Sequence, residues 1–247
     1  MDSKAIFEMI FGSEKFEPLL GELQISQMMN LDDDQPEQLL EFHQKRREVQ
    51  IVLNLIDTLQ LFMDDKLDEF VKVNEEIAKE LTTNGMGKAM LGKIAYIYIE
   101  TGTLYIGGLK SIIPYFNKLG HNWDAKMSLL KSMYSTFKAA KKMEEKKRAD
   151  FEKKSEEEKK AEFEKQEPNE LDMENMAAMG ENMVDVAWGM TVLDIEHTLR
   201  ISIAKLFRDK GVDNGVKAKR ALGLIQLGQI FEKFGDKTGK GVQDMKN

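Results

Sequence analysis

Residues 34–63 read DQPEQLLEFHQKRREVQIVLNLIDTLQLFM, and this stretch decides the fold class of the chain. Asp34 is a suitable N-cap, Pro36 suits the first turn, and Glu37 follows the cap by three residues, as in a capping box. The later apolar residues recur at intervals of three and four, which predicts one long helix with an apolar stripe. This stripe consists of Leu39, Leu40, Val49, Val52, Leu53, Ile56, Leu59 and Met63.

The rest of the chain carries the same helical period, and no segment predicts a sheet. Proline occurs only four times in 247 residues, so long helices are permitted. The sequence therefore predicts an all-α, multi-helix globular domain. Its last helix is apolar almost all round, which favours a central position. The further helical segments are 67–81, 86 towards 114, 176–206 and about 213–231.

A charged segment, residues 138–167, interrupts this pattern with eleven basic and ten acidic residues. The apolar residues that precede it are spaced as in a coiled-coil seam, but the seam fails at Lys141 and Glu144. Pairs such as Glu144 with Arg148 can support an isolated helix, so we expect a long charged helical or coiled-coil arm, with a fluctuating linker as the alternative. Neither side of the arm has an obviously complete set of core helices, so residues 1–247 are predicted to form a single domain with the arm inserted in it. The seam residues are Trp123, Met127, Leu130, Tyr134 and Phe137.

Composition narrows the classes of partner. The formal charge of −7 argues against general nucleic-acid binding, which needs a basic footprint. The chain has no cysteine, which fits a reducing compartment, and no targeting segment is visible at its start. The most apolar stretch, residues 94–109, is shorter than a bilayer requires. These features favour a cytoplasmic protein.

The motifs of enzymes are missing from the sequence. His43, His121 and His197 have no second histidine or carboxylate at a convincing metal spacing. The sequence contains no nucleophile elbow, phosphate-binding glycine loop or dinucleotide fingerprint. We therefore expect a non-catalytic protein with no metal and no cofactor.

Charged residues inside apolar segments form the candidate site. Glu196 and Arg200 stand four residues apart, so they can pair on one helix face. These charges either hold helices together or bind a partner, and the sequence leaves both open. Five methionines between Met173 and Met190 likewise fit either a partner-binding groove or ordinary core packing. The charged candidates are Glu17, Glu22, Arg46, Arg47, Asp194, Glu196, Arg200 and Arg220.

Five blocks of sequence, in order along the chain, carry a resemblance to a known family. They are FGSEKFEP at 11–18 with GEL at 21–23, QKRREV at 44–49, the residues Gly87, Leu91, Ile94 and Tyr98, then Trp188 with DIEHTLR at 194–200, and RAL at 220–222 with LGQIF at 227–231. Together they resemble the C-terminal X-domain of DnaJ-type co-chaperones. The charged arm corresponds to a region that varies in this family.

The resemblance implies a co-chaperone accessory module that binds protein clients or partners for a DnaK-type chaperone. A structural subunit of a larger assembly, built on an X-domain without a J-domain, is the alternative. The His-Pro-Asp tripeptide of J-domains is absent from this sequence, so contact with the chaperone is expected only through a J-domain that this chain lacks. Besides the charged candidates, the partner-binding or structural motif residues are Phe11, Phe16, Pro18 and Trp188.

Two further expectations concern the C-terminal part of the chain. From Arg200 onward, eleven basic residues stand against five acidic ones, which predicts weak attraction to anionic membrane surfaces, with a solvated tail as the alternative. The opening motif around Phe11 and Phe16 and the last helix are both too apolar to stand alone. We expect them to pack on each other or on shared neighbours.

Overall fold

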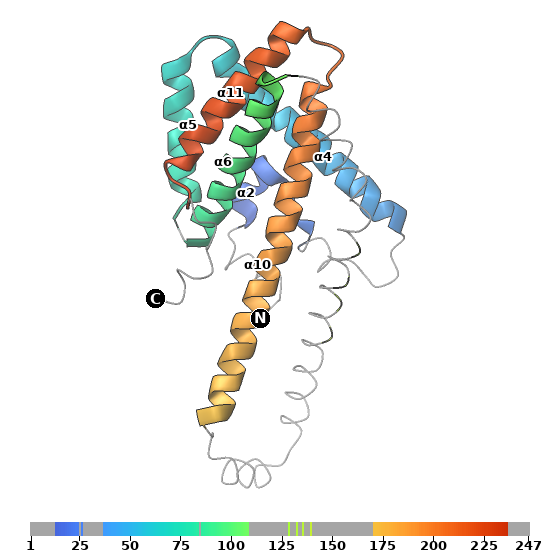
Figure 1. Cartoon of the computed structure of the whole chain (residues 1–247), viewed down its shortest axis with the longest axis vertical. Helices are drawn as coiled ribbons and strands as arrows, with labels where there is room; N and C mark the ends of the chain where they lie inside the picture. Colours follow the sequence, from blue (N-terminus) through green and yellow to red (C-terminus); the bar gives the residue numbers. More distant parts are fainter. Residues whose placement is uncertain are drawn as a thin grey trace. The chain divides into compact units, whose positions relative to one another are not determined.

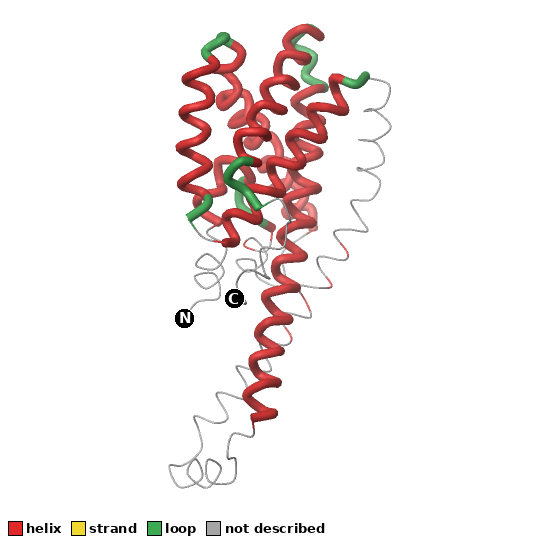
Figure 2. Tube along the Cα trace, turned by 60° about the vertical axis from the view of Figure 1, so that its left-hand side comes forward, coloured by secondary structure: helices red, strands yellow, loops and turns green. Residues whose placement is uncertain are grey.

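The computed structural model describes residues 13–24, 26, 37–83, 85–108, 128, 132, 135, 139 and 170–236. The regular structure of these residues is helical, with no strand among them, which confirms the all-α prediction (Figures 1 and 2). The helices are α2 (Ser13–Leu20), α4 (Glu37–Met63), α5 (Leu67–Leu81), α6 (Gly85–Ile106), α10 (Glu170–Phe207) and α11 (Asn214–Glu232).

The chain divides into two compact units. The first comprises Met1–Trp123 and Thr191–Asn247, and the second comprises Asp124–Met190. The first unit contains α2, α4, α5, α6, α11 and the part of α10 that begins at Thr191. That residues 1–247 form a single domain with an inserted arm stays a prediction.

Helix α11 is the centre of the first unit, as its nearly all-round apolar sequence predicts. It packs most extensively on α6 and also contacts α5 and α4. Leu224, Leu227, Ile230 and Phe231 are fully buried. Asp213 caps its start, because the side chain accepts a hydrogen bond from the backbone N–H of Val216 at 2.9 Å.

Two glycines allow α6 and α11 to approach closely. A Cβ on Gly228 of α11 would lie 2.9 Å from the carbonyl oxygen of Ala95, and one on Gly102 of α6 would lie 2.9 Å from that of Ala221. Gly228 lies beside Ala95, and Ala221 lies beside Gly102, so the two helices run antiparallel. A larger residue would meet a side chain as well, Ile99 at position 228 and Ile225 at position 102, both at 2.7 Å, but the backbone oxygens cannot move without their helix.

Three features differ from the sequence prediction. Helix α6 ends at Ile106 instead of continuing towards Pro114, because Gly107 leaves the helix and Gly108 adopts a φ of +130°. The sequence analysis predicts no helix over the opening motif, yet the short helix α2 forms there with Pro18 inside it. The apolar stripe of α4 does not face the core as a whole, since Val49 and Leu53 are 49% and 50% exposed.

The opening motif and the last helix share a neighbour. Helix α2 packs on α4, and α11 contacts α4 as well. Phe16, Leu19 and Leu20 of α2 are buried. This arrangement agrees with the expectation of shared neighbours for the described part of the opening motif.

Several predicted features lie outside the described residues: Phe11, the cap at Asp34, the seam residues from Trp123 to Phe137, the charged arm apart from Ala139, and the tail beyond Asp236. The arm, the seam and the membrane attraction of the tail therefore stay predictions. Among the described helices, none is long and apolar enough to cross a bilayer.

Candidate functional site: a buried polar network

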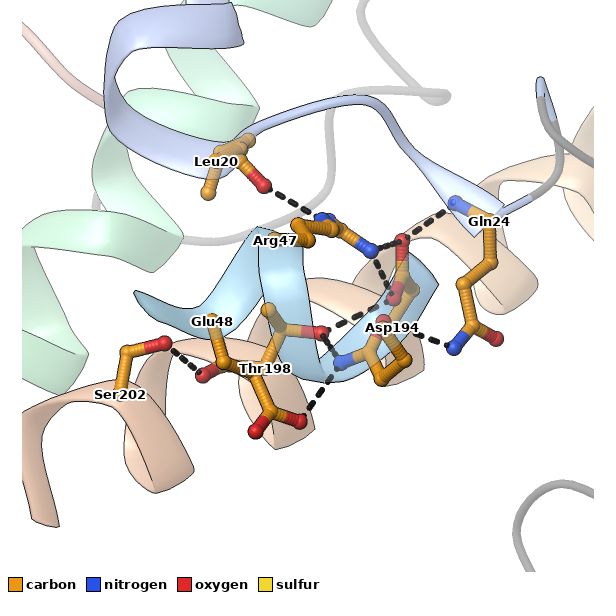
Figure 3. A network of polar contacts seen from close by, with 8 residues as sticks. Leu20, Gln24, Arg47, Glu48, Asp194, Thr198 and Ser202 are labelled. Carbon is orange, nitrogen blue, oxygen red and sulfur yellow. Dashed lines mark hydrogen bonds and ion pairs between the residues drawn. The ribbon is translucent and has the colours of Figure 1, made fainter. Parts of the chain in front are cut away.

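Two of the charged candidates, Arg47 and Asp194, meet in a buried ion pair. Arg47 of α4 donates from Nη1 to both carboxylate oxygens of Asp194 in α10, at 2.8 and 3.0 Å (Figure 3). Each side chain is 3% exposed. Removing two charges from water is costly, so the pair depends on the further hydrogen bonds around it.

The last residue of α2 and the segment that follows it supply two of those hydrogen bonds. Arg47 Nε donates to the carbonyl oxygen of Leu20 at 2.7 Å, and the backbone N–H of Gln24 donates to Asp194 Oδ2 at 2.9 Å. Gly21 makes this possible: its φ is +61°, and a Cβ there would lie 2.7 Å from Arg47 Cγ. Three segments distant in sequence are thus joined at one charge pair.

A second layer of polar side chains surrounds the pair. Gln44 Nε2 donates to Glu48 Oε1 at 3.0 Å and to Thr198 Oγ1 at 3.1 Å, and Thr198 Oγ1 donates to Asp194 Oδ1 at 3.1 Å. Glu48 also pairs with Lys205, at 2.7 Å between Oε2 and Nζ. The network therefore extends for three turns along the interface of α4 and α10.

Two more ion pairs join α10 to α6. Glu196 pairs with Lys93 at 3.0 Å, and Arg200 Nη1 donates to Glu100 Oε2. Each residue of the i,i+4 pair expected from the sequence therefore has a partner on α6. Glu100 also accepts a hydrogen bond from Tyr96 at 3.2 Å, and its negative charge is the main reason that the pKa of Tyr96 lies above 10.0.

Arg220 lies at a separate place, the start of α11. Its Nη1 donates to Asp209 Oδ2 at 3.0 Å, and Asp209 Oδ1 accepts from the backbone N–H of Gly211 at 2.8 Å. The hydrogen bond from Gly211, followed by that from Arg220, holds the pKa of Asp209 below its ordinary value of 3.8. The ionised carboxylate therefore favours the folded state above that value, and its contribution is lost as the pH falls through the lowered pKa.

This pair gives a testable titration. The pKa of Asp209, measured by NMR of its carboxyl carbon, is expected below 3.8. In an Arg220→Met variant it should rise but stay below 3.8, because the hydrogen bond from Gly211 remains. An unchanged pKa in that variant would show that Arg220 does not act on this carboxylate.

The remaining predicted residues fall into two groups. Phe16 and Trp188 are buried, whereas Glu17, Pro18, Glu22 and Arg46 are exposed. The sequence interpretation missed the uncharged members of the network, Gln24, Gln44 and Thr198. Gln44 and Thr198 could have been identified from the sequence, because both lie inside the blocks that carry the family resemblance.

The polar groups of this network contact one another. Its carboxylates, Asp194 and Glu48, each contact a cation and further donors. In the part of the chain that the structure describes, no three His, Asp or Glu side chains are grouped so as to hold a metal ion. Of the two readings left open by the sequence, the geometry favours helix-to-helix attachment for Arg47, Asp194, Glu196 and Arg200.

Comparison with known proteins adds one finding. Residues 44–246, most of the chain, match the model of the family described as the X-domain of DnaJ-containing. No solved structure matches the chain. The match includes the ion pairs between α10 and its neighbours and begins at Gln44, the first residue of the second sequence block.

Proposed function

Because the chain belongs to the DnaJ-X family, which implies a co-chaperone-related role, we propose that it is a non-catalytic accessory module that binds protein clients or partners for a DnaK-type chaperone. The observation that carries this proposal is the family match over residues 44–246. A cytoplasmic location is part of the proposal.

The arrangement of the charged motif residues supports a binding module over an enzyme. Arg47, Asp194 and Arg200 are buried and hold α4, α6 and α10 together. Charged groups that pair with another helix in this way are not free to bind a substrate. Partners would then meet the exposed surface of the helices, which a rigid framework presents in one geometry.

Binding to native and to unfolded luciferase tests the proposal. The full chain is mixed with luciferase that is either native or diluted from denaturant, and complexes are trapped by amine cross-linking and counted by mass spectrometry. We expect complexes with unfolded luciferase and a slower aggregation of it, because a client is recognised by apolar segments that the native state buries. Native luciferase is the matched control.

Two outcomes would contradict the proposal. Equal cross-linking to native and unfolded luciferase would indicate non-specific contact, and no cross-linking to either would remove client binding. Co-purification of the chain in a complex of fixed stoichiometry, without client binding, would favour the alternative function as a structural subunit.

The chain alone is not expected to raise the ATPase rate of a DnaK-type chaperone, since its sequence lacks the His-Pro-Asp tripeptide.

A further inference from the structure

In its N-terminal half, helix α4 buries three polar side chains and exposes two large apolar ones. Gln44, Arg47 and Glu48 are buried in the network, whereas Phe42 and Val49 are 60% and 49% exposed. A surface helix of an isolated domain shows the opposite pattern, with its apolar side turned to the core. Phe42 and Val49 therefore stay largely in water, although their apolar side chains would be more stable if buried.

The outward residues of α4 are spaced as a coiled-coil seam. Starting at Phe42, the positions advance in steps of four, three, four, three and four, the alternation that keeps one stripe facing a partner helix. Leu53 is 50% exposed, and Ile56 is half-buried. Arg46 and Gln60 are the polar members of the seam. The seam positions are Phe42, Arg46, Val49, Leu53, Ile56 and Gln60.

The charges beside this seam are divided between its two ends. Lys45 and Arg46 are exposed near the start, and Asp57 is exposed near the end. Glu41 partly offsets the basic end, since it pairs with Lys45 at 3.3 Å. An antiparallel copy of the same helix would place basic residues beside acidic ones, whereas a parallel copy would place like charges together.

We propose that the α4 seam is covered by α4 of a second copy of this chain, packed antiparallel about a twofold axis. The seam positions then match in layers: Val49 of one copy packs on Leu53 of the other, Arg46 on Ile56, and Phe42 on Gln60. Arg46 of each copy comes beside Asp57 of the other. A contact of this kind is self-complementary, as a twofold interface requires.

The buried polar network on the opposite side of α4 holds this helix in the orientation that the proposed dimer needs. A helix rotates by about 100° per residue, so a small change in its orientation would turn Phe42, Val49 and Leu53 away from a partner. The Arg47–Asp194 pair fixes that orientation. In Figure 1 the N-terminal half of α4 extends away from α5, α6 and α11, so these three helices do not cover its outward side.

Sedimentation equilibrium of the full chain tests the proposal. We expect a monomer–dimer equilibrium with a dissociation constant on the order of 10 µM, because a seam of about five turns buries less than a standard interface. Leu53→Glu should weaken the dimer by about 100-fold, since two carboxylates would enter its centre. The matched control is Leu222→Glu on α11, because Leu222 is also 50% exposed but lies off the seam.

Orientation is tested separately by disulfide formation, since the chain contains no cysteine. A mixture of Phe42→Cys and Gln60→Cys chains should form mixed disulfide dimers on mild oxidation, whereas each variant alone should form few. Circular dichroism of the same samples verifies that both variants keep their helices. The swap Arg46→Glu with Asp57→Arg should restore the dimerisation that either change alone weakens.

Three results would overturn the proposal. A chain that stays monomeric up to about 300 µM would assign the seam to another protein or to another segment of the same chain. Equal loss of dimer in Leu53→Glu and Leu222→Glu would place the contact elsewhere. Disulfides within Phe42→Cys alone would show a parallel pair. Since none of these measurements involves a client, they do not depend on the outcome for luciferase.

Discussion

Replacing Arg47 by methionine is expected to lower the free energy of unfolding by about 3–5 kcal/mol, because the change leaves the carboxylate of Asp194 buried without its cation. Asp194 is 3% exposed and keeps only the hydrogen bonds from Gln24 and Thr198 in that variant. Arg47 also joins the C-terminal end of α2 to α4 through the carbonyl of Leu20, so this hydrogen bond is lost as well. Urea denaturation followed by circular dichroism measures the effect.

The same helix offers a matched control for this prediction. Lys45 is two residues away and also pairs with a carboxylate, Glu41, but its side chain is 71% exposed. Lys45→Met should therefore cost at most about 0.5 kcal/mol. The double change Arg47→Met with Asp194→Leu should recover part of the loss, because no buried charge remains. Equal effects of Arg47→Met and Lys45→Met would show that the pair contributes nothing beyond a surface contact.

Replacing Gly228 by valine is expected to destabilise the fold by about 3 kcal/mol, the upper end of ordinary overpacking. The new Cβ would lie 2.9 Å from the carbonyl oxygen of Ala95 and 3.1 Å from the backbone nitrogen of Ile99. These atoms belong to the backbone of α6 and can move only if the whole helix moves. The change would therefore separate α6 and α11, the most extensive helix pair in the first unit.

Gly189 is the control for the intrinsic preference of helices. It lies inside α10, and a Cβ there would meet nothing within 4 Å. Gly189→Ala should therefore stabilise the protein by about 0.5–1 kcal/mol, because alanine favours the helix. Opposite signs at the two glycines would confirm that close approach, and not helix propensity, explains the need for Gly228. A neutral Gly228→Val variant would contradict the geometry described for α6 and α11.

The buried network and the outward seam of α4 are two consequences of one arrangement. Polar residues of α4 face inward because Asp194 and Thr198 of α10 lie opposite them. Phe42 and Val49, which lie at other angular positions of the same helix, then face outward. The same hydrogen bonds that stabilise the unit thereby determine which surface it presents to a partner.

The amino-acid sequence by itself determined the fold class, most helix positions and the family. Periods of three and four apolar residues are a local property, so they predicted α4, α5 and α11 from neighbouring residues alone. The start of α11 also depends on local sequence, because the side chain of Asp213 caps the helix by accepting a hydrogen bond from Val216, three residues later. Five short blocks were sufficient for the family because their order and spacing can be recognised without coordinates.

Only the tertiary structure decided which side of α4 faces inward and which charges pair. The apolar stripe predicted for α4 included Val49 and Leu53, yet both are half-exposed, while Arg47 is buried. Burial of a charge becomes favourable only when a partner 147 residues away supplies the opposite charge. Glu196 and Arg200 likewise find partners on α6, at separations of 103 and 100 residues. Such pairings depend on how helices pack, and a helical period contains no information about the side chains of another helix.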